Sequence, residues 1–181
     1  MALSTSKILV LLILVVTLQS CDQEPTLQSF YVDNELSQGF TSLDVPVSML
    51  KIDEDALTET QKEAYESVEK LSMIAFVLDE TNKAEYEIEF AKVQTILKNP
   101  KYEELMRGGN TTDGKFQVSF VGKEDSVEEF VLLGNSNEKG FALVRVLGDD
   151  MNLDKIMKLS TVLSSADMDS SQLEEFMGFF K

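Results

Sequence analysis

The sequence predicts an α+β domain: a mainly antiparallel sheet with a C-terminal three-strand meander, and helices packed on it. Three observations support this class. Apolar residues recur at helical spacing in the first half of the chain, they alternate at strand spacing after residue 115, and short turn-forming segments separate the alternating runs. The 181 residues, 43% hydrophobic and 27% charged, suit one folded domain with a short appendage.

The N-terminus has the pattern of a signal peptide. Lys7 precedes a continuous apolar run, Ile8–Val16. A membrane-spanning helix needs about 20 apolar residues, so this run is too short to span. We therefore expect residues 1–20 to be a processing segment rather than part of the fold.

The segment Leu18-Gln19-Ser20-Cys21 resembles the bacterial lipobox and contains the only Cys of the chain. The resemblance implies cleavage between Ser20 and Cys21 and lipidation of the Cys21 thiol, which makes the membrane a partner. The alternative is an ordinary secretory signal with a chance Cys. Residues 21–29 are then the lipidated Cys and a polar tether, and residues 30–181 a single α+β domain. Acidic residues after the Cys also resemble surface-export signals, and the leaflet stays open.

The first half of the domain is predicted to mix helices and strands. Thr58 and Gln61 form a capping-box pattern, which predicts the start of a helix. The nearly all-apolar run 72–78 predicts a strand that is central or covered on both faces. The expected elements are a helix at 27–36, a strand at 41–47, an apolar piece of uncertain type at 48–52, a helix at 59–71 and the strand at 72–78.

A second long helix is expected after a capping pattern at Asn82 and Glu85. It has a wide apolar stripe, which predicts heavy packing. A short helix is expected at 101–107, ended by Gly108-Gly109 as a left-handed cap. The stripe comprises Ala84, Ile88, Ala91, Val93, Ile96 and Leu97.

The second half is predicted to contain the meander, with strands at 116–120, 127–133 and 141–147. In the third strand Arg145 is expected to point outwards. Gly148 is expected to end the meander, and helices are expected at 153–163 and 171–180.

The stretch from Tyr102 to Leu159 resembles one known family. The similar segments are YEELM (102–106), FVLL (130–133), GFALVRVLGD (140–149) and NLDKIMKL (152–159), together with the earlier block 40–52. The chain is similar there to domain-of-unknown-function family 4252 of Bacteroidota envelope proteins. The resemblance implies an exported, often lipid-anchored protein, and it implies no activity and no site residue.

Composition excludes several kinds of chemistry. The chain has no His and one Cys, so a His base, a Ser–His–Asp triad, a Cys/His zinc site and an internal disulfide are excluded. The net charge of −16 disfavours nucleic acid as a partner. We expect no catalytic residue, no cofactor and no metal, and therefore a protein that is not an enzyme.

One segment has the opening spacing of a calcium loop, with Asp150, Asn152 and Asp154 at positions one, three and five. The sixth position is Lys155 instead of Gly, and the twelfth is Thr161 instead of Glu. We therefore expect Asp150 or Asn152 to cap a helix instead.

Two further motifs have structural alternatives. Asp79-Glu80 follows a buried strand, where acid–base pairs often lie, but a helix cap or solvated turn is the favoured interpretation. Asp125-Ser126-Val127 is similar to a short O-glycosylation signal, and a turn explains the same residues.

The last six residues contain a cluster of apolar side chains: Phe176, Met177, Phe179 and Phe180. We expect them to cover an open face of the sheet, and the alternative is an interface for a partner.

The expected function is a lipid-anchored, non-catalytic binding or interaction module of the bacterial cell envelope, an outer membrane lipoprotein with an envelope protein or ligand as its partner. Two alternatives remain. A carrier of a small apolar ligand needs a cavity between sheet and helices. A carboxylate-only glycan hydrolase needs two acids that face each other across a cleft.

Overall fold

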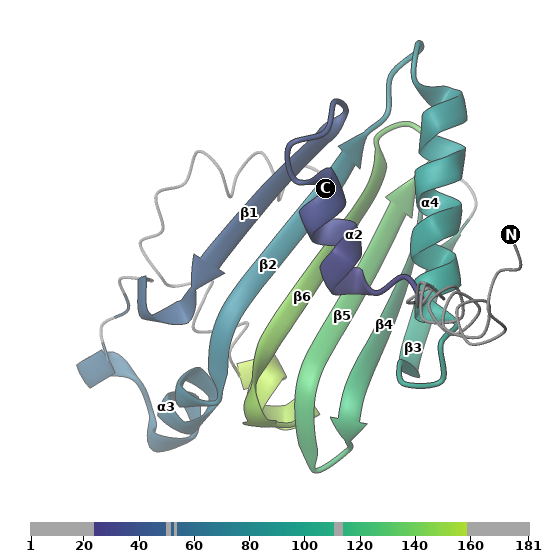
Figure 1. The fold of residues 1–181 in the computed structure, drawn as a ribbon. Coiled ribbons are helices and arrows are strands. Elements are labelled where there is room, and N and C mark those ends of the chain that lie inside the picture. The colour runs from purple at the N-terminus through teal and green to yellow at the C-terminus, as the bar shows by residue number, and fades with distance from the viewer. Residues whose placement is uncertain (1–23, 50–51, 53, 111–113, 159–181) are drawn as a thin grey trace, which may run out of the picture.

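A six-stranded sheet in the order β1-β2-β6-β5-β4-β3, antiparallel throughout, forms the centre of the molecule (Figure 1). The structure is a computed structural model that describes residues 24–49, 52, 54–110 and 114–158. The α+β class and the C-terminal meander are thereby confirmed. The strands are β1 (Phe40–Pro46), β2 (Val68–Val77), β3 (Glu103–Asn110), β4 (Gly114–Lys123), β5 (Ser126–Ser136) and β6 (Gly140–Met151).

Helices connect the first strands and cover the sheet. Two short 3-10 helices, η1 (Val47–Met49) and η2 (Glu54–Ala56), and helix α3 (Glu59–Glu66) connect β1 to β2. Helix α4 (Lys83–Leu97) then leads to the far edge strand β3, and the meander returns until β6 pairs with β2. Helix α2 (Leu27–Asn34) precedes β1 and packs beside α4.

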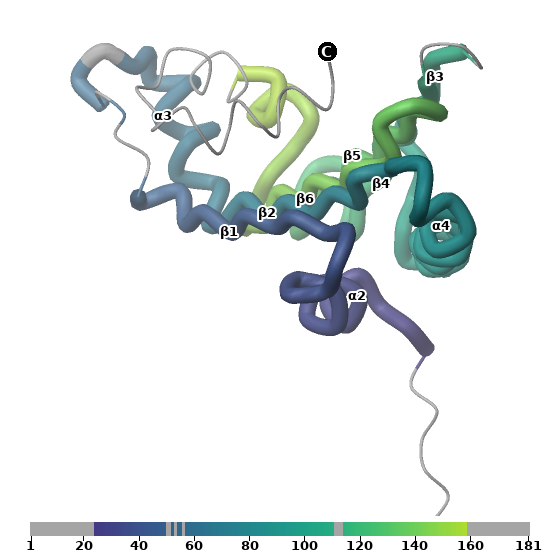
Figure 2. Tube along the Cα trace, turned by 90° about the horizontal axis from the view of Figure 1, so that it is seen from above, coloured from purple at the N-terminus to yellow at the C-terminus, as the bar shows by residue number. Residues whose placement is uncertain are grey.

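The helices divide between the two faces of the sheet. Figure 2 shows α2 and α4 on one face and α3 on the other. Under α2 and α4 lies an aromatic core in which Phe76 and Phe141 stack with their ring centroids 5.9 Å apart. On the opposite face Ala64 of α3 packs with Val68 and Leu71. Side chains therefore pack on both faces of the central strands.

Strand β2 confirms the prediction of a central strand covered on both faces. It pairs with β1 on one side and β6 on the other. Ile74 and Phe76 belong to the core under α2 and α4, whereas Met73 and Ala75 belong to clusters on the opposite face. Because the side chains on both faces are buried, residues 72–78 are nearly all apolar instead of alternating between apolar and polar.

The helix predicted at 59–71 is shorter than expected. Its capping box is confirmed, since Thr58 Oγ1 accepts a hydrogen bond from Gln61 N at 3.3 Å, but α3 ends at Glu66 and β2 begins at Val68. Val68 pairs with Gly148, and Asp149 N donates to Ser67 O at 3.0 Å. The ladder with β6 therefore overrides the helical spacing of the apolar residues.

The prediction of a short helix at 101–107 is wrong. These residues enter β3, which pairs antiparallel with β4 and extends the predicted three-strand meander by one strand. Gly108 lies opposite Phe116, and a Cβ there would lie 2.7 Å from that ring. Gly109 has φ +96° and a Cβ would lie 2.2 Å from Gly114 O. The two glycines thus permit a close hairpin rather than capping a helix.

Helix α4 lies where it was predicted, but only part of its stripe packs on the sheet. Val93, Ile96 and Leu97 are buried, whereas Ile88 is 58% exposed. The side chain of Asn82 makes no cap hydrogen bond to the helix. Its Oδ1 instead accepts from Asp79 N at 2.8 Å, so the capping pattern forms the preceding turn.

The remaining boundaries differ by a few residues. The uncertain piece at 48–52 contributes to η1, and β6 continues past Gly148 to Met151. Residues 153–158 of the predicted helix at 153–163 are helical. The predicted helix at 171–180 lies outside the described residues.

Candidate binding groove

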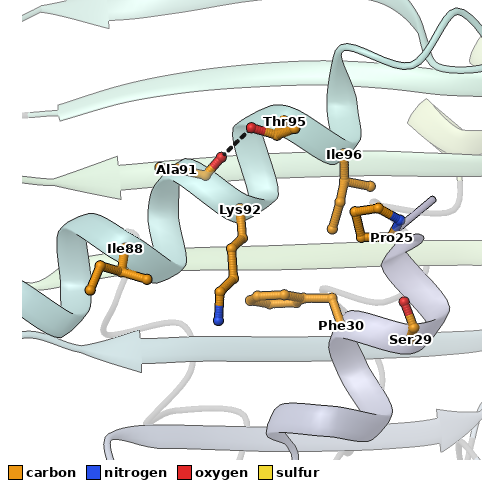
Figure 3. A pocket seen from close by; sticks show the side chains of 8 residues that line it. All are labelled: Pro25, Ser29, Phe30, Ile88, Ala91, Lys92, Thr95 and Ile96. Carbon is orange, nitrogen blue, oxygen red and sulfur yellow. Dashed lines mark hydrogen bonds between the residues drawn. The ribbon is translucent and has the colours of Figure 1, made fainter. Parts of the chain in front are cut away.

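An open groove of about 430 Å³ lies between α2 and α4 (Figure 3). Its lining is mostly apolar, and most of its lining residues come from the two helices. They are Pro25, Ser29, Phe30, Ile88, Ala91, Lys92, Thr95 and Ile96.

The α2 wall begins immediately before the helix. Thr26 is the N-cap of α2, where its Oγ1 accepts from Ser29 N at 3.1 Å while Ser29 Oγ accepts from Thr26 N at 3.0 Å. Leu27 and Phe30 are buried, and the Phe30 ring meets Phe141 at 6.5 Å between centroids. The cap and these core contacts place Pro25, Ser29 and Phe30 along the groove.

Leu27 is fully buried, so the folded part of the chain begins before residue 30. The expected boundary between tether and domain at residues 29/30 falls inside α2. Asn99 Nδ2 also donates to Glu24 Oε2 at 3.0 Å, which fixes the chain to the end of α4.

The α4 wall runs from the exposed Ile88 to Ile96, whose side chain also belongs to the core. Ile88 and Ala91 were predicted to pack in the core, and instead they line the groove. Thr95 Oγ1 donates to Ala91 O at 2.8 Å, which satisfies its hydroxyl within the helix (Figure 3). The α4 wall therefore presents mainly carbon atoms, apart from Lys92.

A charged pair accompanies the apolar walls. Lys92 extends from α4 towards the ring of Phe30 (Figure 3). Its Nζ donates to Glu89 Oε1 at 2.6 Å. Glu89 is only 7% exposed, and its second oxygen, Oε2, is buried with no hydrogen-bond partner among the described residues. A buried acceptor without a donor costs about 1–3 kcal/mol.

A second, polar pocket of about 100 Å³ contacts another side of α2. It contains Arg145, which was predicted to point outwards. That prediction is wrong, because Arg145 is 6% exposed. Its Nε donates to Glu129 Oε1 at 2.6 Å and its Nη1 to Gln28 Oε1 at 3.0 Å. The pocket is lined by Gln28, Tyr31, Val32, Glu35, Ser42, Asp44, Lys70, Ser72 and Arg145.

Burial and charge together set the ionisation of this cluster. Burial raises the pKa of the Tyr31 phenol well above its usual value, partly offset by the nearby Arg145 charge. Burial alone would lower the pKa of Arg145, but the hydrogen bond and charge of Glu129 outweigh it and raise that pKa. Arg145 therefore stays charged, and with two partners engaged it fastens α2 to the sheet rather than offering a free cation.

A family model described as "Domain of unknown function (DUF4252)" matches residues 34–159, more than half of the chain. The chain belongs to the DUF4252 family. No curated protein and no solved structure matches it. The match contains α4 but only the last residue of α2, so the groove lies between the DUF4252 region and the segment that precedes it.

The calcium-like segment of the DUF4252 domain forms a helix start. Asn152 Oδ1 accepts from Lys155 N at 2.9 Å, which confirms the capping prediction. Lys155 Nζ lies 3.1 Å from Asp150 Oδ2, so an ammonium group occupies the place beside that carboxylate. Within the described residues no group of three or more His, Cys, Asp or Glu side chains is placed to hold a metal.

The other motifs lie on exposed turns. Asp79 Oδ1 accepts from Thr81 N at 2.6 Å and from Asn82 N at 3.1 Å, as expected for a solvated turn. The hydrogen bonds from Thr81 and Asn82 lower the pKa of Asp79. Ser126 is exposed at the start of β5, and its glycosylation stays a prediction.

Several predicted residues lie outside the described part of the DUF4252 chain. They include the cleavage and lipidation positions Ser20 and Cys21. In the described part, no helix is both long and apolar enough to cross a membrane. Also outside are the terminal apolar residues Phe176, Met177, Phe179 and Phe180.

The sequence did not predict the groove or the buried ion pair, although both had a signal. Arg145 lies two and four residues from Leu143 and Phe141, so a strand places these three side chains on one face. Glu129 shares a face with Val131 and Leu133 in the same way. In the ladder Arg145 lies opposite Val131, so Glu129 is its diagonal neighbour on the same face, and opposite charges at such positions can pair. The groove had a weaker signal, because Ile88 and Ala91 lie off the helical face that Tyr86, Val93 and Leu97 define.

Proposed function

We propose that this protein is a lipid-anchored, non-catalytic binding module of the bacterial cell envelope, and that the groove between α2 and α4 is its binding surface. The position of Pro25 carries this proposal. Pro25 lines the groove and follows Cys21 by four residues. Four residues reach at most about 14 Å, so lipidation of Cys21 would hold the groove close to the membrane surface.

Anchoring is supported by the sequence. Cys21 is the only Cys and stands at the end of a lipobox-like segment after an apolar run. The net charge of −16 would repel anionic headgroups, and loss of Lys7 on cleavage would make the chain more acidic still. Acyl chains would therefore have to provide the membrane affinity, at about 0.8 kcal/mol per buried CH₂. We place the protein as an outer membrane lipoprotein.

Binding is supported by the groove itself. Its volume of about 430 Å³ lies within the range of ligand sites, and its walls are mainly apolar. Ile88 is 58% exposed, so the groove is open to solvent. An open groove favours a module that holds part of its ligand over the alternative of a carrier that encloses a small apolar molecule.

Anchoring is tested by fractionating cells that express wild-type protein, Cys21→Ala or the control Asp22→Ala. We expect wild type and Asp22→Ala in the membrane fraction, with an acylated N-terminal Cys by mass spectrometry. The Cys21→Ala chain should carry no acyl group. An unacylated Cys21 in the wild-type protein would overturn the anchoring proposal.

Binding is tested with a photo-crosslinking residue at Ala91 in the groove, and at Ala84 as the matched control. Ala84 is an exposed alanine of the same helix that does not line the groove. Adducts specific to position 91 are expected in cells. Equal labelling at both positions would show that the groove is not the binding surface.

A further inference from the structure

We propose that residues 173–180 pack as a helix on the sheet face opposite α2 and α4, over Ala75 and Ala142. The sequence left two roles open for the aromatic residues of this segment, a cover for the sheet and an interface for a partner, and we assign the first. This inference goes beyond the proposed function and depends neither on the groove nor on the anchor. It follows from the apolar surface of the face, the burial of its centre, the place where the described chain ends and the spacing of apolar residues in the segment.

A row of apolar side chains crosses this face from one edge of the sheet to the other. Residues directly opposite each other in antiparallel strands project from the same face, and each of the six strands contributes one apolar residue to the row. The row consists of Leu43, Met73, Val144, Leu132, Val118 and Met106. Met73 is buried, the next four are partly exposed, and Met106 is 47% exposed. A continuous apolar band of this kind indicates a contact surface.

The neighbouring row on the same face has small residues at its centre. Ala75 lies opposite Ala142, and Ala142 lies opposite Gly134. Small residues side by side in adjacent strands let another backbone approach the sheet closely. Phe116, which is 41% exposed, follows Gly134 in this row and adds apolar surface at its side.

The centre of the face is covered. The two alanines are 0% exposed. The described residues that cluster with them are Met73, Leu43 and Val144, all of which are neighbours within the sheet. Strand neighbours lie beside a side chain rather than above it, and α3 packs on a different cluster of this face. The cover is therefore expected outside the described ranges.

The described chain ends on this face. Figure 2 shows its yellow-green end, which includes residues 153–158, on the same side of the sheet as α3. Ile156 packs there on the cluster that contains Phe130, two residues before Leu132 of the apolar row. The intervening residues 159–172 reach at most about 50 Å. Six strands are only about 24 Å wide, so residues 173–180 lie within reach of the whole face.

The segment has the apolar spacing that such a face requires. Four apolar residues recur at positions i, i+3, i+4 and i+7, which gives a helix one apolar side. They are Leu173, Phe176, Met177 and Phe180. Glu174 and Glu175 fall on the other side of the helix, and Phe179 falls beside the stripe. A helix of eight residues is about 12 Å long, which covers about three strands. Because so short a helix is marginal alone in water, it needs a surface of this kind to form.

The test uses the chain with Cys21→Ala, which contains no other Cys. Val144→Cys then places a single thiol in the apolar row, and Ser42→Cys places one at an exposed position of the opposite face. We expect the thiol at 144 to react with a maleimide at least about tenfold more slowly than the thiol at 42. Deletion of residues 173–181 should remove most of this difference. Equal rates in the full chain, or protection that survives the deletion, would overturn the inference.

Two matched variants test the orientation of the helix. Phe176→Ser removes an apolar side chain from the stripe, so it should speed the reaction at 144 and lower the melting temperature by at least about 5 °C. Phe179→Ser makes the same change beside the stripe and should have a smaller effect on both. Circular dichroism confirms that each variant is folded. Equal effects of the two changes would contradict the proposed contact.

A photo-crosslinking residue at Phe176 keeps the test valid if the deletion unfolds the chain. We expect adducts within one chain to peptides of β2 and β6, and fewer from Glu175 on the polar side. Adducts between two chains that increase with protein concentration would instead identify a second copy as the cover. Adducts only to another envelope protein would assign the aromatic residues to an interface. Either result would overturn the inference and leave the groove, on the other face of the sheet, as the proposed binding surface.

Discussion

Arg145 Nε donates to Glu129 Oε1 at 2.6 Å across neighbouring strands of the meander, and the two side chains are 7% and 11% exposed. Arg145 also lies over the Tyr31 ring, 5.3 Å from its centroid, and reaches Gln28. The pair therefore joins β5 and β6 to α2, the helix that forms one wall of the groove.

Removing either charge of this pair should be costly. Glu129→Leu and Arg145→Leu each leave an uncompensated buried charge, so we expect losses of about 3–5 kcal/mol in the free energy of unfolding. The double variant, with Leu at both positions, should be much closer to wild type, because no unpaired charge remains. Urea denaturation of the four proteins measures this difference.

The exposed pair Glu104–Arg107 provides the control. Glu104→Ala should leave the free energy of unfolding nearly unchanged, because solvent screens that pair. If the two single Leu variants were no less stable than this control, the buried pair would contribute little to the fold.

Stability should fall in alkaline solution because of Tyr31. Its folded-state pKa is raised well above the usual value of 10.0. The protonated phenol therefore contributes fully to the free energy of unfolding below about pH 10. Above that pH the unfolded chain releases the proton while the folded chain still holds it, so this contribution is lost as the pH rises. Urea denaturation between pH 8 and about 11 should show this decline.

Tyr31→Phe should make the alkaline decline shallower. At neutral pH it should cost about 1 kcal/mol, because the one O–H of Tyr31 is shared between Leu143 O at 2.8 Å and Ser72 O at 3.0 Å. Tyr65→Phe should alter the decline less, since burial raises the pKa of Tyr65 by a smaller amount. An unchanged slope in Tyr31→Phe would assign the decline to other groups.

Gly140 should tolerate no side chain. Its φ is +108°, and a Cβ would lie 2.0 Å from Phe76 O in the neighbouring strand. We expect Gly140→Ala to lower the free energy of unfolding by at least about 2 kcal/mol, because backbone strain and a clash with the ladder act together. Glu138→Ala, an exposed change in the same turn, should stay within about 0.5 kcal/mol. Thermal melts compare the two.

The capping box of α2 should support both stability and the groove. Thr26→Ala removes the acceptor for Ser29 N, so we expect a loss of about 1 kcal/mol in the free energy of unfolding and weaker photo-crosslinking at position 91 of the groove. Thr26→Ser keeps the hydroxyl and should behave like wild type. Wild-type crosslinking at position 91 in Thr26→Ala would show that the start of α2 does not shape the groove.

Local patterns sufficed for much of the fold. The alternation of Phe116, Val118 and Phe120 indicated β4, and the turn formers between the later strands indicated the meander, because strand period and turn chemistry are local properties. The Thr58–Gln61 capping box indicated the start of α3 for the same reason. These features depend on residues close together in the chain.

The tertiary structure decided where each element ends and what each charged side chain faces. Residues 103–107 form a strand only because β4 offers an unpaired edge, and Val68 joins β2 because β6 lies beside it. Strand β6 has apolar residues on both of its faces, so the sequence does not indicate which face of the sheet around Arg145 is covered. Helix α2 covers that face and brings Gln28 to the guanidinium, from 117 positions away in the sequence.

The groove depends in the same way on two segments that are distant in sequence. The sequence by itself determined the Cys after the apolar run, the acidic body and a helix with an apolar stripe after Asn82. It did not determine that Ile88 and Ala91 would lie beside Phe30. That arrangement follows from the packing of α2 and α4 on one face of the sheet, which depends on contacts across the whole domain rather than on any local period.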